Sequence, residues 1–209
     1  MDEAKIRLSQ KELELVSNTE WILTKNEVIT KAKLLLGNVL DQQIKWLSLH
    51  NLILPAEIKE SSPKISKGEN YRGLPYMVLD HPRLFDKGDV FALRTLFWWG
   101  NFFSTTLQLS GRYKRKFSDN IIHAYSFLAR EGYTVSLGED PWQHHFEAGN
   151  HIAVSKMKKA EFEKSIKEGK FIKLAHRVGI DQWNNVPAIL IGHFKELLKI
   201  IGNSQNEGL

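Results

Sequence analysis

The chain has 209 residues, of which 42% are hydrophobic and 25% are charged, as expected of a folded domain rather than a disordered segment. It contains no cysteine, which excludes disulfides, thiolate metal sites and thiol nucleophiles. The net charge is +5, and the excess of basic side chains lies after residue 60, because residues 1–60 carry 8 basic and 9 acidic side chains.

The hydropathy pattern and the start of the chain favour a soluble, cytoplasmic protein. The segment from Met1 to Arg7 lacks the apolar stretch of a signal peptide. No apolar run approaches the ~20 residues that a membrane helix needs, so we expect no membrane partner. The absence of cysteine suits a reducing compartment.

The first third of the chain is predicted to be helical. Ser9 to Glu12 and Thr24 to Glu27 both fit the capping-box pattern of a helix start. Apolar residues then recur at helical spacing and predict one long helix over residues 25–49. This stripe consists of Ile29, Ala32, Leu36, Val39, Leu40, Ile44 and Leu47. It must pack either on the rest of the domain or on a second copy, and the second alternative would make the chain a homodimer.

Residues 55–75 are predicted to form a loop, because proline, glycine and serine punctuate them. We therefore expect a single domain over residues 1–209. It would comprise an N-terminal helical arm (1–54), the loop (55–75) and an α+β core (76–203).

The middle of the chain is predicted to form strands. A short β-rich run from Tyr76 to Leu79 should end near Pro82. Residues 93–99 and 102–109 form longer β-branched and aromatic runs. Gly100-Asn101 between them predicts a hairpin turn, with a bulge in one long strand as the alternative.

Helices and strands alternate irregularly in the rest of the chain. Helices are predicted over residues 118–130, 158–168 and 187–201, and strands over 133–137, twice within 145–155, and over 171–178. The fold class that this order favours is α+β, with a mainly antiparallel sheet, packed helices, a long N-terminal helical segment and a C-terminal helix.

One face of the predicted hairpin is the leading candidate for a ligand site. Side chains alternate between the two faces of a strand, so the even positions share one face. That face carries aromatic residues together with Arg94, Trp98, Ser104, Thr106 and Gln108. Polar groups that converge among aromatic side chains are typical of a small-molecule pocket, and Arg94 could hold a carboxylate or phosphate. The alternative is an ordinary half-exposed sheet surface.

Residues after the neighbouring strand could line the rim of this site. Asp80, His81 and Arg83 follow the run that ends at Leu79. A catalytic acid–base pair could also be drawn from Asp80, His81, Glu139 and Asp140, so the chain could be an enzyme, although the pattern does not decide this.

A second candidate is a metal site at His144, His145, Glu147 and His151. Imidazole and carboxylate groups are ligands for Zn, Fe or Ni, and these four lie in a short span. Their spacing matches no metal signature, and surface histidines in a loop are the alternative. A metal-dependent enzyme is therefore our second hypothesis.

A third candidate is the basic run Arg112 to Lys116, which could follow a phosphate backbone. A solvated loop is the alternative, and no nucleic-acid-reading fold is evident, so nucleic acid is not the favoured partner. The chain has no P-loop, GxGxxG, GxSxG or HExxH motif. The leading hypothesis is a domain that binds a polar, anionic small molecule, with no cofactor indicated.

Overall fold

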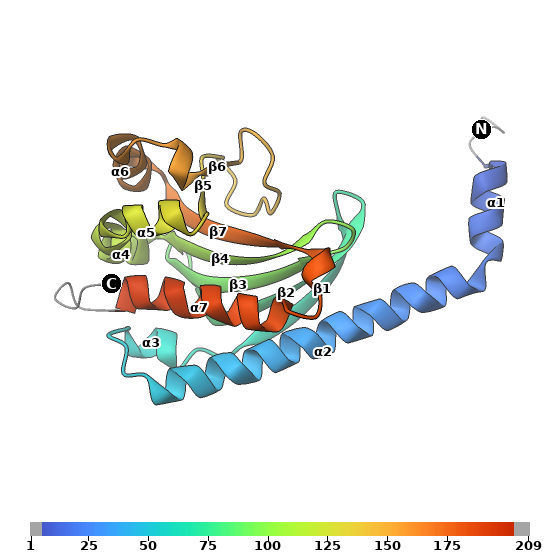
Figure 1. Cartoon of the computed structure of the whole chain (residues 1–209), viewed down its shortest axis with the longest axis horizontal. Coiled ribbons are helices and arrows are strands. Elements are labelled where there is room, and N and C mark those ends of the chain that lie inside the picture. Colours follow the sequence, from blue (N-terminus) through green and yellow to red (C-terminus); the bar gives the residue numbers. More distant parts are fainter. Residues whose placement is uncertain (1–5, 203–209) are drawn as a thin grey trace.

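The computed structural model describes residues 6–202 and contains, within that range, seven α-helices and one sheet of seven antiparallel strands (Figure 1). This architecture confirms the predicted α+β class. No helix in the described range is long and apolar enough to cross a membrane.

The sheet begins as a four-stranded meander and continues with three strands from later in the chain. The spatial order is β1 (Lys64–Tyr71), β2 (Leu74–Phe85), β3 (Val90–Trp98), β4 (Phe102–Ser110), β7 (Phe171–Gly179), β5 (Thr134–Ser136) and β6 (His151–Ala153). Strand β7, which comes last in the sequence, therefore lies beside the central strand β4.

The helices are α1 (Gln10–Ser17), α2 (Thr19–Leu49), α3 (Ala56–Lys59), α4 (Gly111–His123), α5 (Tyr125–Arg130), α6 (Lys159–Glu168) and α7 (Val186–Gly202). Short 3-10 turns span Val154–Lys156 and Ile180–Gln182. The long helices α2 and α7 run side by side beneath the sheet (Figure 1).

We call the side of the sheet that packs on α2 and α7 the helix face. It carries the odd positions of β3 and β4, including Phe97 and Phe103, which are buried against Val186 and Leu190 of α7. The stripe of α2 contributes Ile29, Ala32, Leu36 and Val39 to the same core. The stripe thus packs within the chain, the first of the two predicted alternatives.

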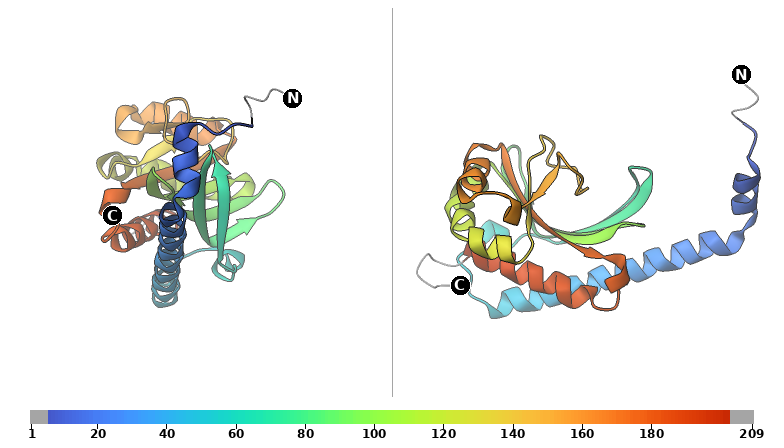
Figure 2. Two further views of the ribbon diagram at one scale, coloured as in Figure 1. Left: turned by 90° about the vertical axis from the view of Figure 1, so that its right-hand side faces the viewer. Right: turned by 45° about the horizontal axis from the view of Figure 1, so that its top comes forward.

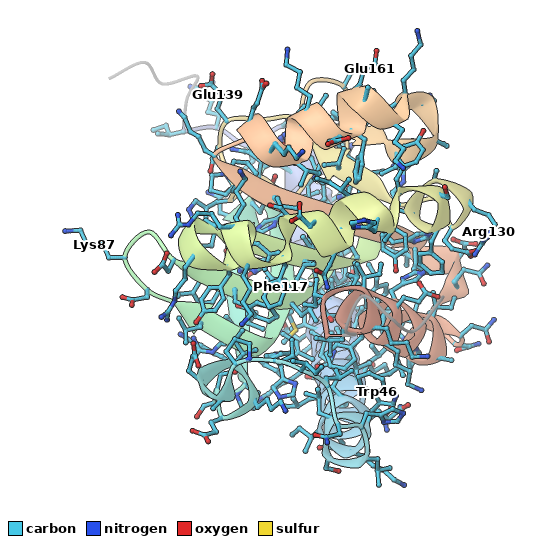
Figure 3. All side chains as sticks on the ribbon, turned by 90° about the vertical axis from the view of Figure 1, so that its left-hand side faces the viewer. Trp46, Lys87, Phe117, Arg130, Glu139 and Glu161 are labelled. Carbon is cyan, nitrogen blue, oxygen red and sulfur yellow. The ribbon has the colours of Figure 1, made fainter. Side chains whose placement is uncertain are left out.

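A second part of the core lies where α4, α6, α7 and the end of α2 come together (Figure 3). Phe117 of α4 is buried there, as is Trp46 of α2, whose ring meets that of Phe194 edge to edge. Lys87, Arg130, Glu139 and Glu161 are directed outwards at the periphery (Figure 3). Helices therefore close one face and one end of the sheet.

We call the opposite side of the sheet the loop face. Residues 137–150, between β5 and β6, lie over it, and we call them the covering segment (Figure 1). The β1–β2 end of the sheet curls away from α2, towards the side that carries this segment (Figure 2). The loop face is thus enclosed by irregular chain rather than by a helix.

Several predicted elements are confirmed. Residues 99–101 connect β3 to β4, and the cross-strand partners Trp98 and Phe102 show that Gly100-Asn101 lies in a hairpin turn rather than a bulge. The helix expected over 187–201 is α7, the helix expected over 158–168 is α6, and the strand expected over 171–178 is β7. The capping box at Ser9 and Glu12 is present at the start of α1.

The prediction of a loop over residues 55–75 is wrong. This segment contains α3, β1 and the start of β2. Strand β1 is polar because it is an edge strand with one side open to solvent, and edge strands commonly carry charged residues. Its composition therefore resembles that of a loop.

The expected helix boundaries at Thr24 and Ser118 are also wrong. Asn18 caps α2, whose first turn begins at Thr19, so the pattern from Thr24 to Glu27 lies inside the helix. Helix α4 begins at Gly111, because Tyr113 and Phe117 are one turn apart and both are buried. The basic run 112–116 is accordingly the first part of a helix.

Two strand predictions fail as well. Strand β2 continues through Pro82, which it accommodates at an irregularity in the pairing between Asp80 and Arg83. Residues 145–150 form no strand, and only residues 151–153 of the range 145–155 join the sheet. Residues 145–150 are held in place by side-chain hydrogen bonds rather than by pairing with a strand, as described below.

Candidate functional site

The pairing of the strands gathers polar side chains on the loop face. Thr106 lies opposite Arg94, which in turn lies opposite Asp80 on β2. Gln108 lies opposite Lys173 of β7. Polar and charged groups from four strands therefore occupy the middle of a face whose outer part is aromatic.

The aromatic part of the loop face is a small core of its own. Val78, Leu96, Trp98 and Phe102 are buried there, and Phe146 of the covering segment packs against them. Ser104 is buried on the same face, opposite Arg177 of β7. All five side chains predicted from the alternation of β3 and β4 thus lie on one buried face.

Arg94 and Asp80 form an ion pair within this site. The Nε of Arg94 donates to Oδ1 of Asp80 at 2.7 Å, and Nη2 donates to Oδ2 at 3.4 Å. The guanidinium also lies 5.3 Å from the ring centroid of Trp142, in the covering segment. The two-pronged pairing and the aromatic contact fix the orientation of the guanidinium.

Lys173 connects the sheet to the covering segment. Its Nζ donates to the carbonyl oxygen of Pro141 at 3.1 Å and to that of Gln143, and its side chain is only 2% exposed. Burial, followed by repulsion from Arg94, lowers the pKa of Lys173 to about 7. A small change in its surroundings, such as a nearby anion, would therefore change its charge near neutral pH.

The covering segment is fixed by a second anchor, the hydroxyl of Tyr71 at the end of β1. This oxygen accepts hydrogen bonds from the backbone N–H groups of His144 at 2.7 Å and His145 at 3.1 Å, and its own O–H donates to Gln143. The side chain of Asn150 donates to the carbonyl oxygen of His145. These bonds explain why an irregular segment keeps a defined position over the sheet.

Several buried polar atoms of the site have unused hydrogen-bonding capacity. Within residues 6–202, no protein hydrogen-bond partner reaches Nη1 of Arg94, Nε1 of Trp98, Oε1 of Gln108, Nδ1 of His145 or Nε2 of His151. Native proteins rarely leave such groups unpaired, because each costs roughly 1–3 kcal/mol. Five of the eight such atoms in the described range lie on the loop face or in the strand and segment beside it, which favours a site for a polar molecule on this side of the sheet.

Two cavities open on either side of Phe146. One of about 530 Å³ is lined by residues that include His151, Lys156 and Arg177. The other, of about 310 Å³, is lined in part by Trp98 and also by Arg177. The guanidinium carbon of Arg177 lies 5.8 Å from the centroid of the Phe146 ring, and this exposed cation lines both cavities.

The predicted rim residues do not all reach this site. Asp80 does, through Arg94. His81 lies on the helix face, where its Nδ1 is 3.2 Å from Oε1 of Gln43 and its ring stacks on Phe194. Arg83 donates to the carbonyl oxygen of Ser62, near the start of β1.

The acid–base candidates are likewise dispersed. Asp80 and His81 point to opposite faces, as described above. Asp140 accepts hydrogen bonds from the backbone N–H of Trp142 and the side chain of Gln143, and these bonds lower its pKa. Glu139 lies at the outer surface, where it lines a different cavity with α6.

The four candidate metal ligands are not gathered around a common point. His144 packs against Tyr71, whereas His151 stacks on Phe146 and bonds to Thr134. His145 lies 3.7 Å from Glu147, which pairs with Arg72. Among residues 6–202, no three His, Asp or Glu side chains are arranged to hold a metal ion.

Burial governs the charge of these histidines. It is the main cause that lowers the pKa of His144 and of His151 to about 3, and the positive charge of Lys173 contributes to both. The two rings are therefore neutral at physiological pH and can each donate and accept one hydrogen bond.

The basic run from Arg112 to Lys116 lies on α4, and several of its cations already have partners. Arg112 approaches Asp89 at 3.5 Å and Glu57 at 3.8 Å. Lys114 donates to the carbonyl oxygen of Lys167. The run is therefore partly neutralised, unlike a free phosphate-binding strip.

Lys173, Tyr71 and Arg177 were missed by the sequence analysis. A signal for Lys173 existed, because it interrupts the apolar run Ile172 to Ala175 and thus marks a charge inside a buried strand. Tyr71 had no such signal, since it lay in the segment predicted to be a loop.

The arrangement offers donors, an acceptor and two or three cations in an enclosed aromatic setting. Such groups can bind an anion and orient its polar substituents. No known protein family, curated protein or solved structure matches the chain.

Proposed function

We propose that the chain binds a small, polar anionic molecule between the loop face and the covering segment. The observation that carries this proposal is a set of buried atoms on the loop face, on Arg94, Trp98 and Gln108, that have no protein partner within residues 6–202. Two of them are donors and one is an acceptor, so the matching ligand has acceptor oxygens together with at least one hydroxyl or amino group.

The charge of the site supports an anion. Asp80 neutralises Arg94, but Lys173 and Arg177 have no carboxylate within ion-pair distance in the described part of the chain. A carboxylate or phosphate would supply the missing negative charge. The two cavities beside Phe146 are of a size that suits a small molecule; Arg177 lines both, and Trp98 lines one of them.

The proposal is tested by thermal-shift screening of the purified full chain against small hydroxy, amino and phosphorylated carboxylates. We expect at least one class to raise the melting temperature, since a ligand that binds the native state stabilises it. The same ligand should bind at least tenfold more weakly to Trp98→Phe, which removes one donor but keeps an aromatic ring, and to Arg177→Ala.

Arg115→Ala is the matched control, because Arg115 is also an exposed arginine but lies on α4, away from the site. Its affinity should equal that of the wild type. The proposal fails if no compound in these classes binds, or if Arg115→Ala weakens binding as much as Arg177→Ala does.

A further inference from the structure

The N-terminal part of the structure projects beyond the body of the molecule. We call residues 6–28, which comprise α1 and the first ten residues of α2, the projecting segment. None of its side chains is buried, and the first buried side chain of α2 is Ile29. Figure 1 shows α2 leaving the sheet behind and α1 turning away at its far end, and both views in Figure 2 agree.

The projecting segment is rich in exposed apolar side chains. Eight large hydrophobic residues of this segment are 41–75% exposed: Ile6, Leu8, Leu13, Leu15, Val16, Trp21, Ile22 and Leu23. The remaining described residues, 29–202, contain only seven exposed large hydrophobic side chains, and among these Phe85 and Trp142 are in ring contact. Concentrated apolar exposure marks an interaction surface, whereas scattered exposure is ordinary.

The exposed surface continues the face by which α2 already packs. Ile22 precedes Ile29 by seven residues, and Trp21 precedes Ala32 by eleven, so each pair shares one side of the helix. In the second half of α2 this side is buried on the sheet and α7. In the first ten residues of α2 no side chain is buried by the rest of the described chain, although Lys25 pairs with Glu69.

The helices of the projecting segment need a partner for stability. Isolated helices shorter than about 12–15 residues are marginal in water, and most helical stability comes from packing of an apolar face. Helix α1 has eight residues, and its capping bonds at Ser9 satisfy only its first turn. No residue of α1 is buried within the described part of the chain, so packing against a second molecule would stabilise this helix.

We propose that the projecting segments of two copies of this chain pack against each other and form a homodimer. The segment is the largest concentration of exposed apolar side chains in residues 6–202, so the surface of this chain that best complements it is a second projecting segment. Such a contact is two-fold symmetric, with the same patch on both copies.

The available area suits a stable dimer. A standard interface buries about 800 Å² per partner, of which about 57% is apolar, or roughly 450 Å². Full burial of one aliphatic side chain removes roughly 60–120 Å² of apolar surface from water. Multiplied by the exposed fractions of the eight side chains, this gives roughly 270–540 Å² of apolar surface per copy.

Charge also favours this contact over one between the bodies of the two chains, by which we mean residues 29–202. The projecting segment carries three basic and four acidic side chains and is close to neutral. The chain as a whole has a net charge of +5. Pairing through the segments therefore keeps two basic bodies apart, and an antiparallel arrangement separates them furthest.

Light scattering with size-exclusion chromatography of the full chain, from low to high micromolar concentration, tests the proposal. We expect a dimer for the wild type and a monomer for Trp21→Glu/Ile22→Glu. The double variant should still unfold in one cooperative thermal transition, because neither side chain is part of the core. Leu34→Glu is the control, since Leu34 is an exposed residue of α2 outside the projecting segment, and it should remain dimeric.

The absence of native cysteine allows the contact to be located. Single cysteines at positions 13, 16, 21 and 22 should give at least one disulfide-linked dimer on oxidation, whereas Leu34→Cys should not. A monomeric wild type overturns the proposal and points to a different protein as the partner. A dimer that persists in Trp21→Glu/Ile22→Glu, or that is linked only through position 34, also overturns it.

Discussion

Lys173 is the residue on which the enclosure of the loop face depends most directly. Its ammonium group is buried, which is costly, and this cost is offset by two backbone carbonyl groups of the covering segment. The lowered pKa of about 7 reflects the same balance. The side chain thus contributes to the position of residues 137–150 more than to the stability of the sheet.

The substitution Lys173→Met should therefore loosen the covering segment locally. Methionine keeps the length and removes both hydrogen bonds, each worth about 1 kcal/mol, while it also removes the buried charge. We expect amide hydrogen exchange in residues 137–150 to become about 5–30 times faster, with a small change in melting temperature. The control is Lys170→Met, an exposed lysine before β7, and exchange that is equal in the two variants would contradict this role.

At the same scale, the candidate side chains on β3 and β4 could be predicted, whereas their partners could not. Alternation along two strands and the glycine in their turn place Arg94 and Gln108 on one face. Asp80 and Lys173 join them through pairings with β2 and β7, and the second of these brings together residues 65 positions apart in the sequence. No local pattern specifies that β7 lies beside β4.

The two ends of helix α2 lie in different surroundings. Its second half buries Leu36 and Val39 in the core, whereas its first ten residues bury nothing within the chain. The apolar spacing predicted the helix and most of its packing face from residue 25 onwards, but the predicted stripe residue Ile44 is 45% exposed, whereas the polar Gln43 is buried. The spacing could not show where the body of the molecule ends, because this depends on the size of the sheet.

The two halves of α2 should respond differently to truncation of a leucine. Leu36→Ala should lower the free energy of unfolding by about 2–5 kcal/mol, since Leu36 is fully buried. Leu23→Ala, in the projecting segment, should change it by less than about 0.5 kcal/mol at concentrations where the chain is monomeric. Urea denaturation of the two variants measures both values, and a large loss for Leu23→Ala would mean that the segment packs on the body.

At the scale of the whole molecule, buried histidines should make the fold sensitive to acid. Burial lowers the pKa of six of the eight histidines, which lie on both faces of the sheet: His81, His144, His145, His151, His176 and His193. In the unfolded chain these rings take up protons near pH 6.5, whereas in the folded chain they do so only at lower pH. Stability is therefore fully present above pH 6.5 and is lost as the pH falls towards 3–4.

Melting temperatures measured between pH 7.5 and pH 4.5 should accordingly fall steadily with pH. His193→Phe should reduce the fall, because the folded-state pKa of His193 is lowered to about 4 and each unit of difference corresponds to about 1.4 kcal/mol. His123→Gln, which changes an exposed histidine, is the matched control. A melting temperature independent of pH over this range would contradict this account of the histidines.

The two faces of the sheet are covered in different ways. Helices stabilise one face and one end of the sheet, and the other face is left to a segment held by side-chain hydrogen bonds. Elements held in this way open at lower free energy than packed strands, and ligand sites commonly use them. The central claim is that a small anion binds beneath this segment.

Hydrogen–deuterium exchange of the full chain, with and without the compound that gives the largest thermal shift, tests this claim most directly. The account predicts slower exchange in residues 137–150 and in the facing parts of β3, β4 and β7, with little change in α1 or the first half of α2. Slower exchange confined to other regions, such as the cavity beside the C-terminal end of α2, would place the binding site elsewhere and contradict the claim.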